Sequence, residues 1–263
     1  MNPIATHPAA GRARGWIAGP RPVYPPALRL FCLPYAGGAA QAYESWRGAL
    51  GADVEVCPIE LPGRGARLRE RSYTRLEPLV DALATAITAE LDVPYALFGH
   101  SMGALVAFET AAELHRRGDR RPEVLFVSGT PAPRLGRRHP PLHAASDADL
   151  TARLETLGGL PDELRDESEL LRCFLPAIRA DFAVFETYEY RARPPLGCPV
   201  VAFTGSDDHE LPPARLAPWA AESTGRFACH VLPGGHFFPR TSQAALLRLV
   251  RAALPTQRSY GDA

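Results

Sequence analysis

Six short apolar runs alternate along this chain with stretches of helical periodicity. The runs are short and rich in β-branched and aromatic residues, as buried strands are. They are Leu28–Leu33, Val54–Leu61, Tyr95–Phe98, Glu123–Ser128, Val200–Thr204 and Phe227–Leu232. Pro58 indicates that the second strand bends or ends early. This alternation predicts an α/β fold with a mostly parallel central sheet and helices on both faces.

Helical periodicity marks the segments between the strands. Apolar residues recur at helical spacing in Arg75–Leu91, Met102–His115, Pro212–Glu222 and Thr241–Leu254. A longer segment, about 144–190, shows helical pattern without any strand. An insertion of helices at the carboxyl edge of a parallel sheet would lie over the ligand crevice, so we interpret it as a lid. The alternative is a further pair of covering helices with no role in substrate access.

The ends of the chain differ from the middle. Residues 1–26 are rich in Pro, Gly, Ala and Arg without periodicity, which predicts a flexible or loosely docked N-terminal arm before a domain at 27–254 and a tail at 255–263. Lys plus Arg equals Asp plus Glu at 29 each, so no net charge attracts nucleic acid or an anionic membrane. The chain has neither an apolar run of about 20 residues nor a signal-like N-terminus, and we expect a cytoplasmic protein. Its five cysteines are expected to be reduced and buried, without a metal site.

The strongest chemical signal is the pentapeptide Gly99-His100-Ser101-Met102-Gly103. It fits G-x-S-x-G, and it lies between a predicted strand and a predicted helix, which is the context of the nucleophile elbow of an α/β-hydrolase. Glycines two residues to either side remove side chains that would collide with neighbouring backbone. We therefore predict that Ser101 is a catalytic nucleophile; the alternative is an ordinary tight turn.

A serine nucleophile needs a base and an acid that orients the base. His236 follows the last strand on a Gly-Gly hinge, where this fold places its base, whereas His230 lies inside that strand and is expected to be packed. The acid should follow the strand Val200–Thr204, and there both Asp207 and Asp208 are candidates. The residues alone leave that choice open.

A glycine-rich turn, Pro34-Tyr35-Ala36-Gly37-Gly38, follows the first strand. Such a turn lets backbone amides approach a ligand oxygen, so together with the amide of Met102 it would supply two donors to an oxyanion. The turn does not fit G-x-G-x-x-G, and no dinucleotide or other cofactor is expected.

Five segments together resemble the type II thioesterases of polyketide and nonribosomal peptide biosynthesis. They are LPYAGGAA, LPGRGARLRE, FGHSMGALVAFE, FTGSDDHEL and LPGGHFF, in this order between residues 28 and 254. The resemblance implies a helical lid, a triad acid at Asp208 and oxyanion amides at Ala36 and Met102, with Tyr35 as the alternative to Ala36. Many members have His in place of Tyr35. It assigns no role to Arg64, for which a structural salt bridge is favoured.

The resemblance also implies a function and a partner. Such enzymes hydrolyse stalled acyl groups from the phosphopantetheine arm of acyl or peptidyl carrier proteins, without metal or cofactor, and we expect a free-standing chain of this kind. The rival enzymes are a general carboxylesterase and a medium-chain fatty-acyl thioesterase, which would share the triad. A rival from another class is a non-catalytic binding protein on a hydrolase scaffold.

Overall fold

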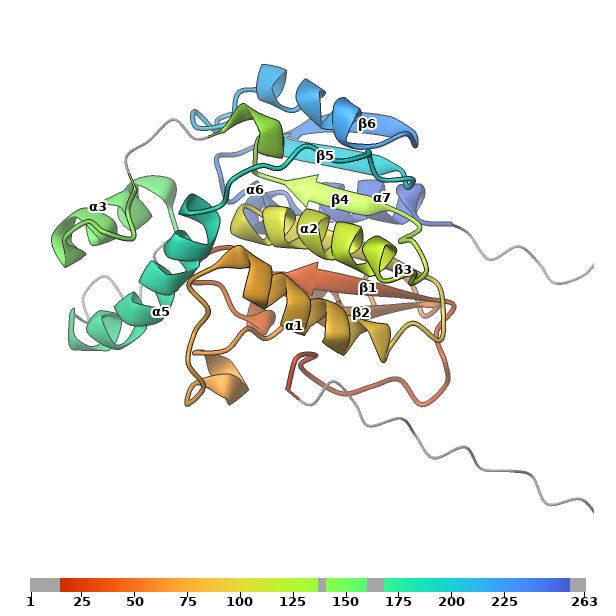
Figure 1. Cartoon of the computed structure of the whole chain (residues 1–263), viewed down its shortest axis with the longest axis horizontal. Helices are drawn as coiled ribbons and strands as arrows, with labels where there is room; N and C mark the ends of the chain where they lie inside the picture. Colours follow the sequence, from red (N-terminus) through yellow and green to blue (C-terminus); the bar gives the residue numbers. More distant parts are fainter. Residues whose placement is uncertain (1–14, 137–140, 160–167, 256–263) are drawn as a thin grey trace, which may run out of the picture.

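The computed structural model describes residues 15–136, 141–159 and 168–255. Six parallel strands form one sheet in the order β2-β1-β3-β4-β5-β6 (Figure 1). They are β1 (Leu28–Leu33), β2 (Val54–Pro58), β3 (Tyr95–His100), β4 (Leu125–Ser128), β5 (Val200–Gly205) and β6 (Phe227–Leu232). The predicted α/β-hydrolase architecture is confirmed. As expected, β2 ends at Pro58, which cannot donate a ladder hydrogen bond.

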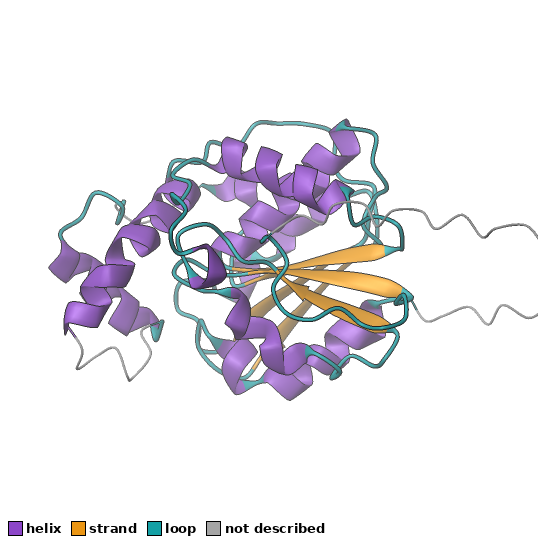
Figure 2. Ribbon diagram, turned by 90° about the horizontal axis from the view of Figure 1, so that it is seen from below, coloured by secondary structure: helices purple, strands orange, loops and turns teal. Residues whose placement is uncertain are grey.

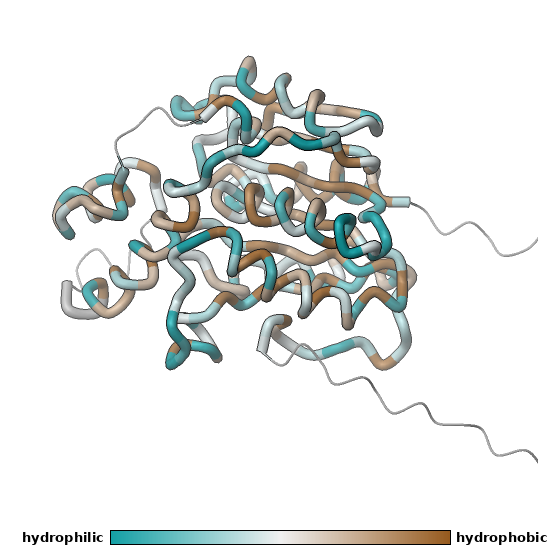
Figure 3. The backbone as a smooth tube through the Cα atoms, viewed as in Figure 1, coloured by the Kyte–Doolittle hydropathy of each residue, from teal (hydrophilic) through white to brown (hydrophobic). Residues whose placement is uncertain are grey.

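Helices cover both faces of the sheet (Figures 1 and 2). One face carries α1 (Leu76–Thr88) and α2 (Met102–Arg116), and the other carries α7 (Gln243–Ala253) and the short 3₁₀ helix η1 (Ala40–Trp46). Successive side chains of β1 enter opposite cores: Phe31 packs under α1 and α2, and Leu30 packs under η1 and α7. Hydrophobic residues therefore concentrate along the central strands, which are brown in Figure 3.

Several further helical elements outside the insertion are short. They are η2 (Gly65–Arg67), η3 (Pro133–Leu135), η4 (Pro213–Arg215), η5 (Ala217–Glu222) and α6 (Phe238–Thr241). The predicted helix Pro212–Glu222 was wrong in type, because Pro213 and Pro218 lack the amide hydrogens that an α-helix interior needs and the segment forms two 3₁₀ turns. The predicted helix Thr241–Leu254 is interrupted at Ser242, between α6 and α7.

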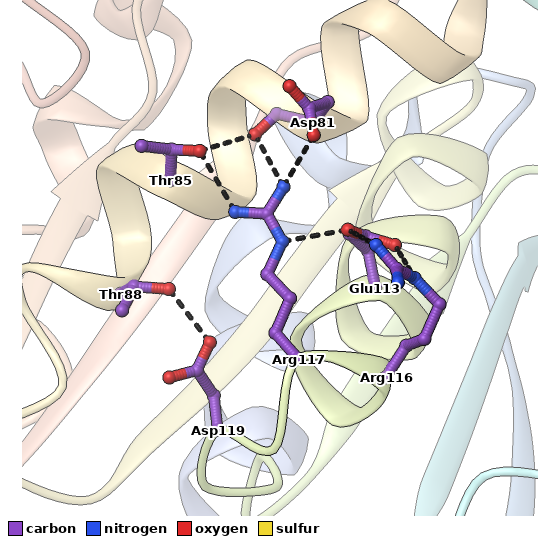
Figure 4. A network of polar contacts seen from close by, with 7 residues as sticks. All are labelled: Asp81, Thr85, Thr88, Glu113, Arg116, Arg117 and Asp119. Carbon is purple, nitrogen blue, oxygen red and sulfur yellow. Dashed lines mark hydrogen bonds and ion pairs between the residues drawn. The ribbon is translucent and has the colours of Figure 1, made fainter.

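An arginine joins α1 to the C-terminal end of α2 (Figure 4). Arg117 donates to the carboxylates of Asp81 on α1 and Glu113 on α2, both at 2.7 Å, and to Thr85 Oγ1 at 2.9 Å. Its neighbour Arg116 also pairs with Glu113. These contacts fix the end of α2 that lies opposite Ser101.

The insertion contains α3 (Asp147–Leu157) and α5 (Ser168–Glu186), which extend from one side of the body in both ribbon views (Figures 1 and 2). The two helices share a small apolar cluster of their own: Leu150, Leu154, Leu171, Leu175 and Ile178. Further along α5, Val184 joins the main core beneath α2. The helix α5 therefore connects the insertion to the body; residues 160–167 lie outside the described residues.

The described part of the segment before β1 contacts the body. In residues 15–26, expected to be flexible or loosely docked, Ile17 forms an antiparallel bridge with Ile59, and Trp16 is buried with the guanidinium of Arg67 4.1 Å from its ring centre. Of the two alternatives, docking therefore describes this part: besides the indole, the Ala18 amide donates to the Pro58 carbonyl at 2.9 Å and the Glu60 amide donates to the Trp16 carbonyl at 2.8 Å. Residues 1–14 and 256–263 lie outside the described residues.

The cysteines differ in exposure. Cys32, Cys57 and Cys198 are buried as free thiols, but Cys173 on α5 and Cys229 on the edge strand β6 are exposed, contrary to the expectation for all five. None of the described helices is both long and apolar enough to span a bilayer.

Candidate active site

Ser101 lies on a strained turn between β3 and α2. Its φ of 53° and ψ of −118° make it the one described non-glycine residue with a positive φ. A Cβ on Gly99 would lie 2.1 Å from the carbonyl oxygen of Gly103, and a Cβ on Gly103 would lie 2.3 Å from that of Leu33. Both glycines are therefore required by backbone contact, as the elbow motif predicts, and the turn places Ser101 at the N-terminus of α2.

The loops after β5 and β6 bring Asp208 to His236. Asp208 Oδ2 lies 2.8 Å from His236 Nδ1, and Asp208 Oδ1 accepts hydrogen bonds from the amides of Glu210 and Leu211. Burial alone would raise the pKa of Asp208, but the hydrogen bond and charge of His236, with the two amides, lower it below its usual value. The carboxylate is therefore ionised at neutral pH, and Nδ1 of His236 donates to it.

The other two candidates lie elsewhere. Asp207 is exposed, and its carboxylate accepts from the neighbouring Ser206 hydroxyl. His230 lies on β6, with its ring stacked on Phe203 at a centroid distance of 5.6 Å. The structure thus brings together His236 and Asp208, and it separates Asp207 and His230 from this pair.

Ser101 and His236 line the same cavity of about 500 Å³. Among the side-chain hydrogen bonds of the described residues, His236 pairs with Asp208, and none joins it to Ser101. Apolar walls come from Leu105 on α2, and from Leu154 and Phe182 on α3 and α5. Because the insertion supplies part of the wall, its position supports the lid interpretation over the alternative of two remote covering helices.

His100 is a neighbour of the site that the sequence analysis overlooked. Its buried ring lies 5.0 Å from that of His236 between centroids, and its Nδ1 is 3.0 Å from Ser128 Oγ. Burial first, and then the charge of His236, hold the pKa of His100 well below its usual value. A neutral imidazole therefore packs against the candidate base. Gly129 leaves room for both rings, since a Cβ there would lie 2.5 Å from His100 Cε1.

The turn after β1 lies beside Ser101. Ala36 and Met102 both line the cavity, and among the hydrogen bonds of the described residues neither amide has an acceptor. Met102 begins α2, where free amides and the helix dipole favour negative charge. The amide of Tyr35 is equally without an acceptor in the described part of the chain, so the preference for Ala36 stays a prediction. The Tyr35 ring packs edge-on against Phe237 at 4.8 Å.

Comparisons with known proteins agree with this architecture. A family model described as a thioesterase domain matches residues 28–254. A relative named linear gramicidin dehydrogenase LgrE, from Brevibacillus parabrevis, is 37% identical over 95% of each chain. The dehydrogenase in that name is said of the relative, whereas the family model that matches this chain is a thioesterase domain.

Solved structures of thioesterases are similar to this chain. RedJ, a thioesterase from the prodiginine pathway of Streptomyces coelicolor, has 43% identity and a TM-score of 0.83, covering 90% of this chain and 91% of its own. The type II thioesterase BorB, from the borrelidin biosynthetic cluster, has 38% identity and a TM-score of 0.84, covering 91% and 98%. The chain therefore belongs to the thioesterase family, with the α/β-hydrolase fold, and within that family it belongs with the type II thioesterases.

Proposed function

We propose that this thioesterase releases acyl groups from the phosphopantetheine arm of carrier proteins through an acyl-serine intermediate, with Ser101, His236 and Asp208 as the triad. The observation that carries the proposal is the His236–Asp208 pair at the rim of the cavity that also holds the strained Ser101. The type II thioesterases of biosynthetic clusters among the similar structures support a carrier-bound substrate.

In the first half-reaction Ser101 Oγ attacks the thioester carbonyl carbon. His236 Nε2 takes the hydroxyl proton as the new C–O bond forms, and the carbonyl oxygen becomes an oxyanion. We assign the amides of Ala36 and Met102 to that oxyanion. The C–S bond then breaks, the pantetheine sulfur leaves with the proton from His236, and the acyl group stays on Ser101.

In the second half-reaction a water molecule attacks the acyl-serine. His236 takes a proton from the water, the same amides hold the second oxyanion, and collapse returns the proton to Ser101 Oγ with release of a carboxylic acid. Asp208 holds Nδ1 of His236 in its protonated form throughout, so Nε2 is left as the base, and it stabilises the imidazolium that forms in each half-reaction.

Part of the cavity wall is apolar and suits the chain of an acyl group. Leu105, Leu142, Phe182 and Phe185 provide apolar surface, and the volume of about 500 Å³ is in the range of small-molecule sites. Charged side chains, including Arg134 and Glu189, also line the cavity. We propose that the acyl group occupies the apolar part and that the pantetheine arm passes between the charged groups.

The cytoplasmic location expected from the sequence stays a prediction.

The test is hydrolysis of a panel of acyl-loaded carrier proteins, compared with the same acyl groups on pantetheine, on coenzyme A and on p-nitrophenol. We expect the carrier-bound thioesters to have the highest kcat/KM. Ser101→Ala, which removes the nucleophile and little volume, should abolish hydrolysis of all of them.

Each rival predicts a different outcome. Equal kcat/KM for aryl esters and carrier thioesters would indicate a general carboxylesterase, and a preference for medium-chain coenzyme A or fatty-acyl thioesters would indicate the fatty-acyl rival. Acyl-carrier binding without turnover by the wild type would support the non-catalytic rival and contradict the proposal.

A further inference from the structure

A buried ion pair connects the lid helix α5 to the loop after β2. Arg64 Nη1 and Nη2 donate to Asp181 Oδ2 and Oδ1 at 2.6 and 2.7 Å, in a two-pronged geometry. The two side chains are only 7% and 5% exposed. Stability alone is a weak reason for such a pair, because apolar side chains of similar volume often stabilise a protein as well.

The same pair holds the turn that follows β1. Asp181 Oδ2 also accepts the amide of Gly37 at 2.7 Å, and Arg64 Nη1 also donates to the carbonyl oxygen of Gly38 at 2.8 Å. Gly37 has a φ of +79°, and a Cβ there would lie 3.0 Å from Ile178 Cγ1 on α5. One helix of the insertion therefore packs directly on this turn and also binds its backbone.

Two neighbouring amides of the turn have different partners. The amide of Gly37 donates to Asp181. The amide of the preceding residue, Ala36, has no acceptor among the described residues, and Ala36 lines the cavity. An unpaired carboxylate one residue from an oxyanion donor would oppose the negative charge of the intermediate. Arg64 neutralises Asp181, so the carboxylate can fix the turn without that electrostatic penalty.

The position of Asp181 on α5 adds a connection to the lid. Three residues before it, Ile178 belongs to the apolar cluster that α5 shares with α3. The helix that builds the lid cluster is therefore the helix that holds Gly37. If α5 shifts away from the body, the turn loses both its carboxylate acceptor and its packing partner.

We propose that Asp181 and Arg64 are positioning residues of the thioesterase reaction. Through their hydrogen bonds to Gly37 and Gly38 they orient the oxyanion amide of the turn after β1. The orientation of that amide therefore depends on the position of α5 against the body. The inference rests on the proposed acyl-serine function. Neither residue touches the substrate in this proposal. Their effect falls on the tetrahedral intermediates, which need the amide, and spares the bound substrate.

The test compares two ligands for each variant. An alkyl boronic acid forms a tetrahedral adduct with Ser101 and places an oxygen where the oxyanion would lie; an acyl-pantetheine amide, with NH in place of sulfur, resembles the bound substrate. For Asp181→Asn we expect kcat on a p-nitrophenyl ester to fall about 10- to 100-fold, as small displacements in a site can cause, with KM little changed. Boronate affinity should fall by a similar factor, and amide affinity should stay near the wild-type value.

The matched control is Glu55→Gln. Glu55 pairs with Arg29 at 2.8 Å, with both side chains as buried as the Arg64–Asp181 pair, but the pair lies at the amino ends of β1 and β2, away from the site. This variant should lose stability while it keeps kcat and the boronate-to-amide affinity ratio. Arg64→Lys retains the charge but not the bidentate geometry, and it should lose kcat and boronate affinity while it keeps amide affinity, as Asp181→Asn should. If Asp181→Asn does not fold, Arg64→Lys tests the inference in its place.

The inference is overturned if Asp181→Asn and Arg64→Lys behave like Glu55→Gln, or if they weaken the boronate and the amide equally. The ester and the boronate keep this outcome separate from the carrier question. A wild-type protein that hydrolyses the ester but ignores acyl-carrier proteins would refute the proposed substrate and still permit the test of Asp181. A wild type that reacts with neither would refute both.

Discussion

Asp208 binds Nδ1 of His236 at 2.8 Å and is itself held by two backbone amides through its other carboxylate oxygen. The carboxylate is thereby fixed on both sides, so its orientation does not depend on a bound substrate. The neighbouring Asp207, one residue earlier, is exposed, and its carboxylate accepts a hydrogen bond from the Ser206 hydroxyl at 3.2 Å. This contrast between adjacent aspartates leads directly to the first prediction.

Asp208→Asn should lower kcat by about 10⁴-fold, as the same change does in a serine protease triad, because an amide at this position can present its NH₂ group to the ring and favour the wrong tautomer. Asp207→Asn, which removes an adjacent carboxylate of the same size, should leave kcat near the wild-type value. Steady-state kinetics on a p-nitrophenyl ester checks both. An equal loss in the two variants would contradict the assignment of Asp208.

The lowered pKa of Asp208 predicts a pH dependence of stability. The folded-state pKa lies below the value of about 3.9 in an unfolded chain, so the ionised carboxylate stabilises the fold at pH values above about 3.9. This contribution should disappear as the pH falls through the folded-state pKa. The free energy of unfolding by urea, measured for wild type and Asp208→Asn, should therefore differ at pH 6 and converge below about pH 4. A difference that widens on acidification would show the opposite sign of shift.

Gly103→Ala should destabilise the elbow. The added Cβ would lie 2.3 Å from the Leu33 carbonyl oxygen and 2.6 Å from that of Pro34, and both are backbone atoms that cannot rotate away. We expect a loss of about 1–3 kcal/mol, as for other overpacked sites, seen as a lower melting temperature. Gly235→Ala is the matched control for stability, because the atom nearest to its Cβ, the carbonyl oxygen of Asp207, would be 3.9 Å away. Equal melting temperatures for the two variants would contradict the steric account.

Tyr35 tests whether the turn after β1 acts through its backbone. The ring packs against Phe237, and within the described contacts the hydroxyl has no hydrogen-bond partner. Tyr35→Phe should therefore keep kcat near the wild-type value, whereas Tyr35→Ala should lose stability by more than the roughly 0.5–1.5 kcal/mol that an aromatic pair contributes beyond burial. Melting temperature and kcat measured together separate the two effects. A large loss of kcat in Tyr35→Phe would assign the hydroxyl a direct role.

Local signals in the sequence were enough to predict the scaffold and to single out two of the candidate site residues. The strand runs predicted β1 and β6 to the residue, and Pro58 marked the end of β2. The elbow followed from two glycines at fixed spacing around Ser101, and the position of His236 followed from its place after the last strand. Each of these features depends on residues a few positions apart, where periodicity and steric exclusion operate.

Other features required the folded chain. The segment at 212–222 was wrongly predicted as one helix, because its apolar spacing was given more weight than its prolines. Composition gave no sign that Trp16 would dock on the body. The motif Pro62-Gly63-Arg64 gave no role to Arg64, whose partner Asp181 lies 117 residues away. His100 was read only as the variable position of the elbow, although its ring packs against His236.

The sequence by itself therefore determined the order of strands and helices, the strained serine and the loop that carries the histidine. The order of residues left two adjacent aspartates open, the family resemblance favoured Asp208, and the tertiary structure shows Asp208 against His236. Only the tertiary structure showed that a carboxylate on α5 holds the turn beside Ser101. The reason is physical. Backbone sterics and hydrophobic periodicity act between near neighbours and leave a pattern in the sequence, whereas the direction of a side chain across a loop, and the partner it finds, depend on contacts that exist only after distant segments have packed together.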